Sequence, residues 1–166
     1  MRADKIYLVG FMGAGKTTLA RALARRLDWE AVDIDELIEQ REHATIAEIF
    51  ARQGEPYFRS VERAVLAGQI GPRHRVVATG GGTFVDPANR AAINSDGASI
   101  WLDVPIDRAV ARLPADGRRP LAADRAEFER LYHFRRAAYQ QAHVRIDAGR
   151  ASVEALADEV MDWLRR

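Results

Sequence analysis

The stretch Gly10-Phe11-Met12-Gly13-Ala14-Gly15-Lys16-Thr17 decides the fold. It matches the pattern G-x-x-x-x-G-K-[ST], in which glycines turn backbone N–H groups toward phosphate oxygens, the lysine adds a mobile cation and the hydroxyl can ligate Mg²⁺. A continuous apolar run over 6–9, typical of a buried strand, precedes it, and an amphipathic helical pattern over 19–27 follows it. The alternative is a glycine turn that merely joins a strand to a helix. The context favours a phosphate-binding loop.

Further strand patterns alternate with helical ones along the rest of the chain. The strand patterns cover 31–34, 75–79, 99–104 and 144–146. A capping box at 45–48 opens a helix that we expect to stop near Gly54, Pro105 begins another helix, a long helix covers 125–142, and Ser152 caps a last helix to Trp163. This alternation predicts an α/β fold with a parallel sheet covered by helices on both faces.

Length and composition restrict the class of protein. The 166 residues fit one domain, 48% of them are hydrophobic, and the net charge of +1 gives no global field toward nucleic acid or a membrane surface. The chain has no cysteine, which excludes disulfides and thiolate catalysis. The apolar run near the N-terminus is too short for a signal peptide or a membrane helix, so we expect a cytoplasmic protein.

Two carboxylates follow the second predicted strand. Asp33 and Asp35 flank Ile34 at the edge of the sheet where open α/β proteins bind ligands. One can hold the water shell of Mg²⁺ while the other orients an attacking hydroxyl and accepts its proton. The alternative is a helix N-cap and a solvated surface charge. The phosphate loop upstream favours the functional interpretation.

Arginines and glycines mark three more places. Arg59 and Glu62 are three apart on a predicted helix, and sequence leaves open whether they form a surface ion pair or Glu62 orients Arg59 toward an anion. Arg118-Arg119-Pro120 lies in a polar loop that is either a lid over phosphates or a solvated basic segment. Gly80-Gly81-Gly82 follows the third strand as a plain turn or as a backbone surface for substrate. Arg135 and Arg136 on their own indicate a solvated helix face.

Taken together, these motifs resemble the shikimate kinase family in order and near its spacing. The shared set is the phosphate loop 10–17, Asp33-Ile34-Asp35, Gly54-Glu55-x-x-Phe58-Arg59-x-x-Glu62, the glycine triplet 80–82, Arg119-Pro120-Leu121 and Arg135-x-x-x-Tyr139. The resemblance implies a three-layer α/β/α P-loop kinase fold with five parallel strands in the order 2-3-1-4-5. It also implies Mg²⁺-dependent transfer of the γ-phosphate of ATP to the 3-hydroxyl of shikimate, in chorismate and aromatic amino-acid biosynthesis.

The resemblance also assigns roles to individual residues. Lys16, Asp35 and Arg119 would be catalytic. ATP would contact Gly13, Ala14, Gly15, Lys16, Thr17, Thr18, Arg112 and Arg119. Shikimate would contact Asp35, Arg59, Gly81 and Arg135, with Phe50, Phe58, Gly80 and Gly82 around them. Thr17 would ligate Mg²⁺ and Asp33 would reach the metal through water. The implied layout is a single domain over 1–166, with a substrate-binding region over 33–62 and a lid over 113–124. We expect a monomer whose partners are shikimate and ATP/ADP, with no nucleic acid and no membrane.

The chain departs from the family pattern at two places. Ala137-Ala138 stand where proline and leucine are common, and Ala122-Ala123 follow Leu121 where a second leucine is common. Arg136 matches no family role. Two other functions are weighed against the resemblance. A gluconate-kinase-like enzyme has no reason to keep Arg59 with Arg135, and a ligand-sensing module should have lost Lys16, Asp35 or Arg119.

Overall fold

The computed structural model describes residues 1–111 and 122–166. Its centre is a five-stranded parallel sheet of the order β2-β3-β1-β4-β5, which confirms the predicted topology. The strands are β1 (Lys5–Val9), β2 (Glu30–Asp33), β3 (Arg75–Ala78), β4 (Ala98–Asp103) and β5 (Val144–Asp147). After β1, the chain adds β2 and β3 on one side of it and then β4 and β5 on the other. The strand order therefore reverses beside β1, and sheets of this kind bind ligands at such a reversal.

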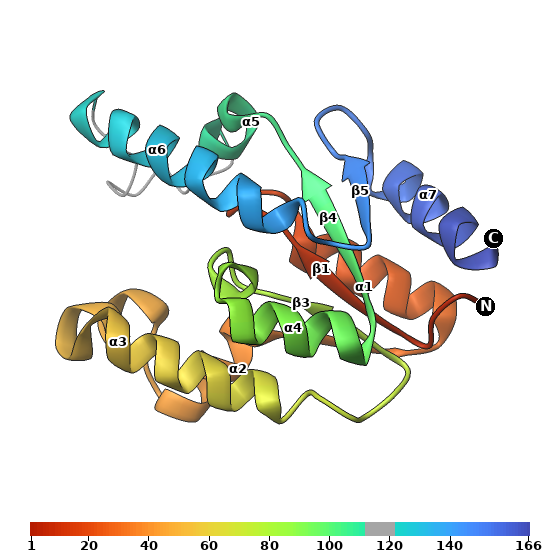
Figure 1. Cartoon of the computed structure of the whole chain (residues 1–166), viewed down its shortest axis with the longest axis horizontal. Coiled ribbons are helices and arrows are strands. Elements are labelled where there is room, and N and C mark those ends of the chain that lie inside the picture. The colour runs from red at the N-terminus through yellow and green to blue at the C-terminus, as the bar shows by residue number, and fades with distance from the viewer. Residues whose placement is uncertain (112–121) are drawn as a thin grey trace.

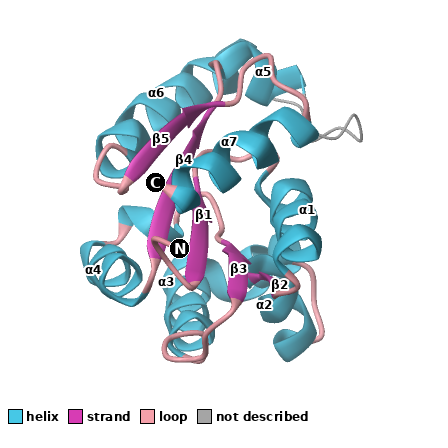
Figure 2. Cartoon of the chain, turned by 90° about the vertical axis from the view of Figure 1, so that its right-hand side faces the viewer, coloured by secondary structure: helices cyan, strands magenta, loops and turns pink. Residues whose placement is uncertain are grey.

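Helices cover both faces of this sheet. They are α1 (Lys16–Leu27), α2 (Ile34–Glu42), α3 (Ile46–Ala67), α4 (Pro87–Asp96), α5 (Ile106–Ala111), α6 (Ala122–Tyr139) and α7 (Val153–Arg165), with a 3-10 turn η1 (Thr83–Val85) after β3. Figure 2 shows α1 and α7 on one side of the sheet and α4 on the other. The two chain ends meet (Figure 1), where the backbone N–H of Arg2 donates to the carbonyl oxygen of Leu164 at 2.8 Å.

Side-chain caps fix where the helices begin. Thr45 accepts a hydrogen bond from the backbone N–H of Glu48 at the start of α3, and Ser152 accepts one from Ala155 at the start of α7, as predicted. Sequence analysis missed α4. Its signal is Asp86 followed by Pro87, since the Asp86 carboxylate accepts from the backbone at the first turn and proline fits the first helical position.

The helical segment that Thr45 caps does stop at Gly54, as predicted, and a second helical segment of α3 follows it directly. Gly54 adopts a φ of 81°, a left-handed conformation that a helix cannot contain, and the chain then resumes helical geometry through Pro56. The glycine therefore makes the kink that separates the two helical segments of α3. The kink redirects the second half of α3, which carries Phe58, Arg59 and Glu62.

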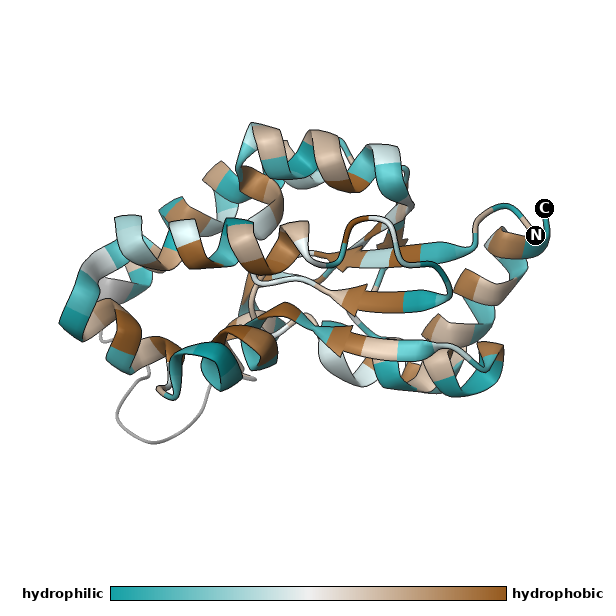
Figure 3. Cartoon of the chain, turned by 90° about the horizontal axis from the view of Figure 1, so that it is seen from below, coloured by the Kyte–Doolittle hydropathy of each residue, from teal (hydrophilic) through white to brown (hydrophobic). Residues whose placement is uncertain are grey.

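The core lies between the sheet and the helices. All five residues of β1 and all six of β4 are buried, as expected for central strands covered on both faces. In Figure 3 the strands carry brown, apolar stretches with teal segments toward their ends, and the helices carry both colours. Of the three tryptophans, Trp101 is 3% exposed, and Trp29 and Trp163 pack partly buried against the same core.

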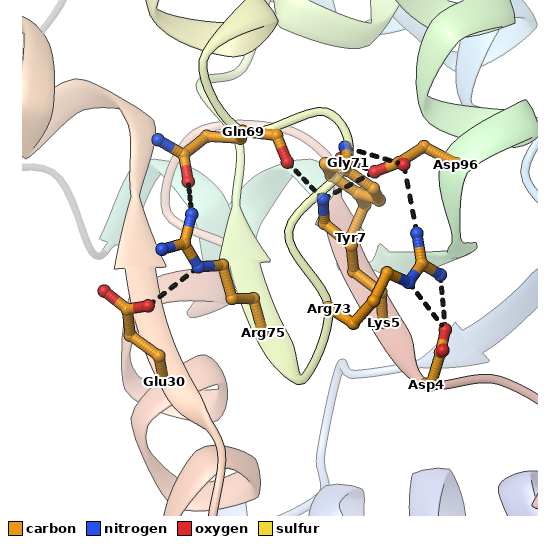
Figure 4. A network of polar contacts seen from close by, with 9 residues as sticks. All are labelled: Asp4, Lys5, Tyr7, Glu30, Gln69, Gly71, Arg73, Arg75 and Asp96. Carbon is orange, nitrogen blue, oxygen red and sulfur yellow. Dashed lines mark hydrogen bonds and ion pairs between the residues drawn. The ribbon is translucent and has the colours of Figure 1, made fainter.

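A polar network holds the opposite, N-terminal edge of the sheet together (Figure 4). Lys5 is fully buried, and its ammonium group donates to the Asp96 carboxylate at 2.5 Å. The Tyr7 hydroxyl, the backbone N–H of Gly71 and the Arg73 guanidinium donate to the same carboxylate. Asp96 thereby ties the end of α4 to β1 and to the segment that enters β3, far from the edge where the predicted site lies.

None of the helices in the described parts of the chain is both long enough and apolar enough to span a membrane.

Candidate active site

The phosphate-binding loop joins β1 to α1 at the C-terminal edge of the sheet. Gly10, Gly13 and Gly15 all have positive φ angles, so the motif does form the predicted non-helical turn. Lys16 is buried, and its ammonium group donates to the carbonyl oxygens of Gly10 and Phe11 at 2.7 and 3.0 Å. Burial lowers the pKa of Lys16 to about 8, although the carboxylates of Asp35 and Asp33 oppose that shift. Here the lysine side chain is folded back over the loop's own backbone.

Asp33 and Asp35 have different surroundings. One Asp33 oxygen caps α2 by accepting the backbone N–H of Glu36 at 3.1 Å, and the other accepts a hydrogen bond from the Thr17 hydroxyl. Asp35 is largely buried, and burial raises its pKa to about 6, with Asp33 adding to the shift and Lys16 opposing it. The N-cap alternative is therefore right for Asp33, which also faces the loop, while Asp35 is not a solvated surface charge.

The glycine triplet is where the site comes together. A Cβ atom added at Gly80 would lie 2.9 Å from Oδ1 of Asp35, one at Gly81 would lie 2.9 Å from Nη1 of Arg135, and one at Gly82 would lie 2.5 Å from Nη1 of Arg59. Real Cβ atoms do not approach other atoms that closely. Three consecutive glycines thus leave room for three charged side chains that come from α2, α6 and α3.

Glu62 holds Arg59 in place from inside the protein. Its side chain is 1% exposed, and Nη1 of Arg59 donates to both of its carboxylate oxygens, at 3.0 and 3.2 Å. The surface-pair alternative is therefore wrong. The Thr83 hydroxyl donates to the same carboxylate at 2.9 Å and accepts from the backbone N–H of Gly80 at 3.0 Å. Thr83 was missed in the sequence because a hydroxyl after a glycine turn carries no motif.

Arg135 lies partly buried at the other side of the triplet. Burial lowers the pKa of its guanidinium, which lies 5.8 Å from the ring centroid of Phe11 and beside Tyr139. The Tyr139 hydroxyl donates to the carbonyl oxygen of Gly81. Among the described residues no carboxylate forms an ion pair with Arg135, in contrast to Arg59. A partly buried cation that has no carboxylate partner favours an anionic ligand.

The two predicted aromatic neighbours lie on α3. Phe58 is 4% exposed and Phe50 is 36% exposed, and their ring centroids are 4.6 Å apart. The Arg59 guanidinium lies 5.1 Å from the Phe58 ring centroid, so this ring supports the arginine directly. Phe50 packs against Phe58.

Other predicted residues have different outcomes. Thr18 lies in the first turn of α1 with an exposed side chain, beside the loop residues Gly13, Ala14 and Gly15. Arg112, Arg119 and most of the lid predicted over 113–124 lie outside the residues that the structure describes. The prediction that Arg136 lies on a solvated helix face was wrong, because its guanidinium forms an ion pair with the buried carboxylate of Asp103.

Comparison with known proteins identifies this arrangement. The family model described as shikimate kinase matches residues 12–165. A shikimate kinase of Persephonella marina is 38% identical over 161 residues, which cover 96% of this chain and 98% of the relative. One from a Sulfurihydrogenibium species is 37% identical over 162 residues, covering 97% and 98%.

Solved structures give the same result. The shikimate kinase of Acinetobacter baumannii in complex with shikimate has a TM-score of 0.91 at 34% identity and covers 98% of this chain and 93% of that one. The Aquifex aeolicus shikimate kinase has a TM-score of 0.89 at 31% identity, covering 97% and 96%. A deoxyadenosine kinase of M. mycoides, at 16% identity and a TM-score of 0.62, shares the fold alone.

Proposed function

The chain belongs to the shikimate kinase family, and from that premise we propose how its own residues perform the reaction. It is an ATP-dependent kinase that acts on shikimate. We propose that the acceptor is the 3-hydroxyl and that the products are shikimate 3-phosphate and ADP. The observation that carries the assignment of roles is the glycine triplet, because Asp35, Arg135 and Arg59 all meet it within contact distance.

In this proposal Arg59 and Arg135 bind the shikimate carboxylate. Both guanidinium groups lie against the glycine turn, and each can present two N–H donors to a carboxylate. Glu62 fixes the fork of Arg59, and Tyr139 lies beside Arg135, so little side-chain freedom is lost on binding. Because the missing Cβ atoms at 80–82 leave room for these charged groups, the ring of the substrate is proposed to lie beside them, with Gly81 nearest and Phe58 beside Arg59.

Asp35 is the proposed base. Its pKa of about 6 leaves the carboxylate ionised at neutral pH while keeping it a better proton acceptor than an ordinary aspartate. As the 3-hydroxyl oxygen forms a bond to the γ-phosphorus, the bond from that phosphorus to the bridging oxygen of ADP breaks. The hydroxyl proton passes to Asp35, and the leaving electron pair stays on the β-phosphate of ADP.

The phosphate side of the site fits a magnesium ion. The Thr17 hydroxyl would ligate the ion, and the Asp33 carboxylate, which already accepts a hydrogen bond from that hydroxyl, would reach the ion through water. Mg²⁺ in kinases takes its remaining ligands from water and phosphates. When bound, the ion would neutralise charge on the β- and γ-phosphates. Lys16 is proposed to turn from the carbonyl oxygens of Gly10 and Phe11 to the phosphate oxygens of ATP.

Arg112 and Arg119 remain in the proposal on the family motif alone. Arg112 matches the position against adenine, and Arg119 would stabilise the transferring phosphoryl group from the lid proposed over 113–124. The rest of the proposed layout is one domain over 1–166, with the phosphate loop at 10–17 and the substrate-binding region over 33–62.

A coupled assay of ADP formation tests this function. The purified protein should form ADP only when ATP, Mg²⁺ and shikimate are all present, and turnover no higher than in the shikimate-free control would refute the function. Arg59→Ala and Arg135→Ala should each raise the KM for shikimate about tenfold to a hundredfold, because each removes a charge-assisted contact of roughly 1.5–3 kcal/mol. Arg52→Ala, which removes an exposed arginine from the same helix as Arg59, should leave the KM unchanged.

A further inference from the structure

Arg136 makes a dense set of contacts at the end of β4. Its guanidinium donates to the Asp103 carboxylate through both terminal nitrogens, at 2.5 and 3.3 Å, and to the Tyr132 hydroxyl at 3.0 Å. The same guanidinium lies 4.9 Å from the ring centroid of Trp101 and 5.4 Å from that of Tyr132. This is the bidentate, ring-stacked arrangement that a lysine cannot reproduce.

The acceptor of these bonds is fixed to the sheet. Asp103 is the last residue of β4, and its side chain is only 8% exposed. Arg145 of β5 donates to the same carboxylate at 2.8 Å, and the Tyr132 hydroxyl donates to the backbone carbonyl oxygen of Val104 at 2.6 Å. Arg136 and Tyr132 therefore anchor one side of α6 to the C-terminal end of β4.

The neighbouring residues of α6 point into the active site. Successive residues of an α-helix are about 100° apart around its axis, so the direction of Arg136 also sets the direction of Arg135. Tyr139, three residues further on, packs its ring 6.0 Å from that of Trp101 and donates its hydroxyl to Gly81. Trp101 is thus contacted by both Arg136 and Tyr139, and the helix meets the sheet and the glycine triplet in one fixed orientation.

We propose that Arg136, acting through Asp103, is a positioning residue that sets the rotation of α6 and so places Arg135 against Gly81 for the substrate carboxylate. This rests on the proposed role of Arg135. A rotation of α6 by about 15° moves an atom roughly 5 Å from the helix axis by about 1 Å. A displacement of that size is enough to weaken a bidentate contact. In this chain Arg136 directly precedes Ala137-Ala138, the pair that departs from the family pattern.

The chain offers a matched control. Arg145→Gln removes an arginine from the same carboxylate and the same tryptophan, since its guanidinium lies 5.7 Å from the Trp101 ring centroid, but Arg145 belongs to β5 and not to α6. The experiment measures kcat and the KM values for shikimate and for ATP in the wild type and in the Arg136→Gln, Arg145→Gln and Arg135→Ala variants. Thermal unfolding of each protein is recorded beside the kinetics.

Arg136→Gln should raise the KM for shikimate roughly tenfold, with the KM for ATP within twofold of wild type, and Arg145→Gln should leave both unchanged. An unchanged KM for shikimate in folded Arg136→Gln, or an equal rise in Arg145→Gln, overturns the proposal. If Arg136→Gln is not recovered folded, Arg136→Lys is measured in its place. A rise in the KM for shikimate of less than about tenfold supports the proposal, because lysine keeps the charge but lacks the planar fork, and an unchanged KM overturns it. If turnover by the wild type does not depend on shikimate, or if Arg135→Ala leaves the KM for shikimate unchanged, the proposed function is refuted instead.

Discussion

Replacing Asp35 by asparagine should abolish turnover and at the same time stabilise the folded protein. The carboxylate is largely buried, lies near the Asp33 carboxylate, and closely approaches the backbone of Gly80. Ionising it there is costly, and a site that needs an ionised base must bear that cost in the folded state. Asparagine has the same shape without the charge. Loss of the base should lower kcat by about a hundredfold to ten-thousandfold.

The size of the stability gain follows from the pKa. The Asp35 pKa rises from an ordinary 3.8 to about 6 on folding. Because each tenfold change in proton affinity is 1.36 kcal/mol, ionised Asp35 lowers the free energy of unfolding by about 3 kcal/mol at pH 7. A raised carboxyl pKa favours folding below pH 3.8, and this contribution is lost as the pH rises through about 6. The gain in Asp35→Asn should therefore fall below about 1 kcal/mol at pH 4.

Urea unfolding of the ligand-free protein at pH 7 and pH 4 measures this difference. At pH 7 the variant should unfold at a higher urea concentration and melt roughly 5–10 °C above wild type, and at pH 4 the two curves should nearly coincide. Glu36→Gln is the control, since Glu36 is exposed in the same turn of α2 and should change little at either pH. An equal gain at both pH values, or none at pH 7, would refute the electrostatic reasoning.

Two further changes test the surroundings of the site, and a third tests the opposite edge of the sheet. Gly82→Ala should raise the KM for shikimate at least tenfold, because the new Cβ would lie 2.5 Å from Nη1 of Arg59; an unchanged KM would contradict the packing. Thr83→Val should raise the same KM severalfold and Thr83→Ser should restore it, because only the hydroxyl bonds Glu62; kinetics that do not distinguish valine from serine would contradict this. Asp96→Asn should lower the free energy of unfolding by about 3 kcal/mol in urea titrations, because the Lys5–Asp96 pair is buried. The KM for shikimate should not change, since this pair lies at the opposite edge of the sheet, and a raised KM would contradict that separation.

The sheet and most helix starts could be predicted from sequence because they depend on local signals. A continuous apolar run specifies a strand covered on both faces, and a Ser, Thr or Asp side chain specifies a helix start through one backbone hydrogen bond. The charges at Lys16, Asp33 and Asp35 could be placed because the ends of parallel strands gather at one edge. None of these inferences needs a contact between distant segments beyond the strand order itself.

Apart from α4, whose signal is local, the errors occurred where a distant contact decides the outcome. Arg136 has the pattern of an exposed helix residue, and only the fold brings it to Asp103, 33 residues earlier in the chain. Thr83 depends in the same way on Glu62, 21 residues away.

The glycine triplet combines a local sequence signal with contacts between segments that lie apart in the chain. As a sequence, Gly80-Gly81-Gly82 shows only that something approaches the backbone closely, and it does not say what. In the fold, the approaching groups are Asp35, Arg135 and Arg59, which arrive from three helices that lie apart in sequence. A single Cβ at any of the three positions would displace a different charged group. The triplet is therefore the most restrictive element of the site, and substitution there should impair substrate binding before it impairs folding.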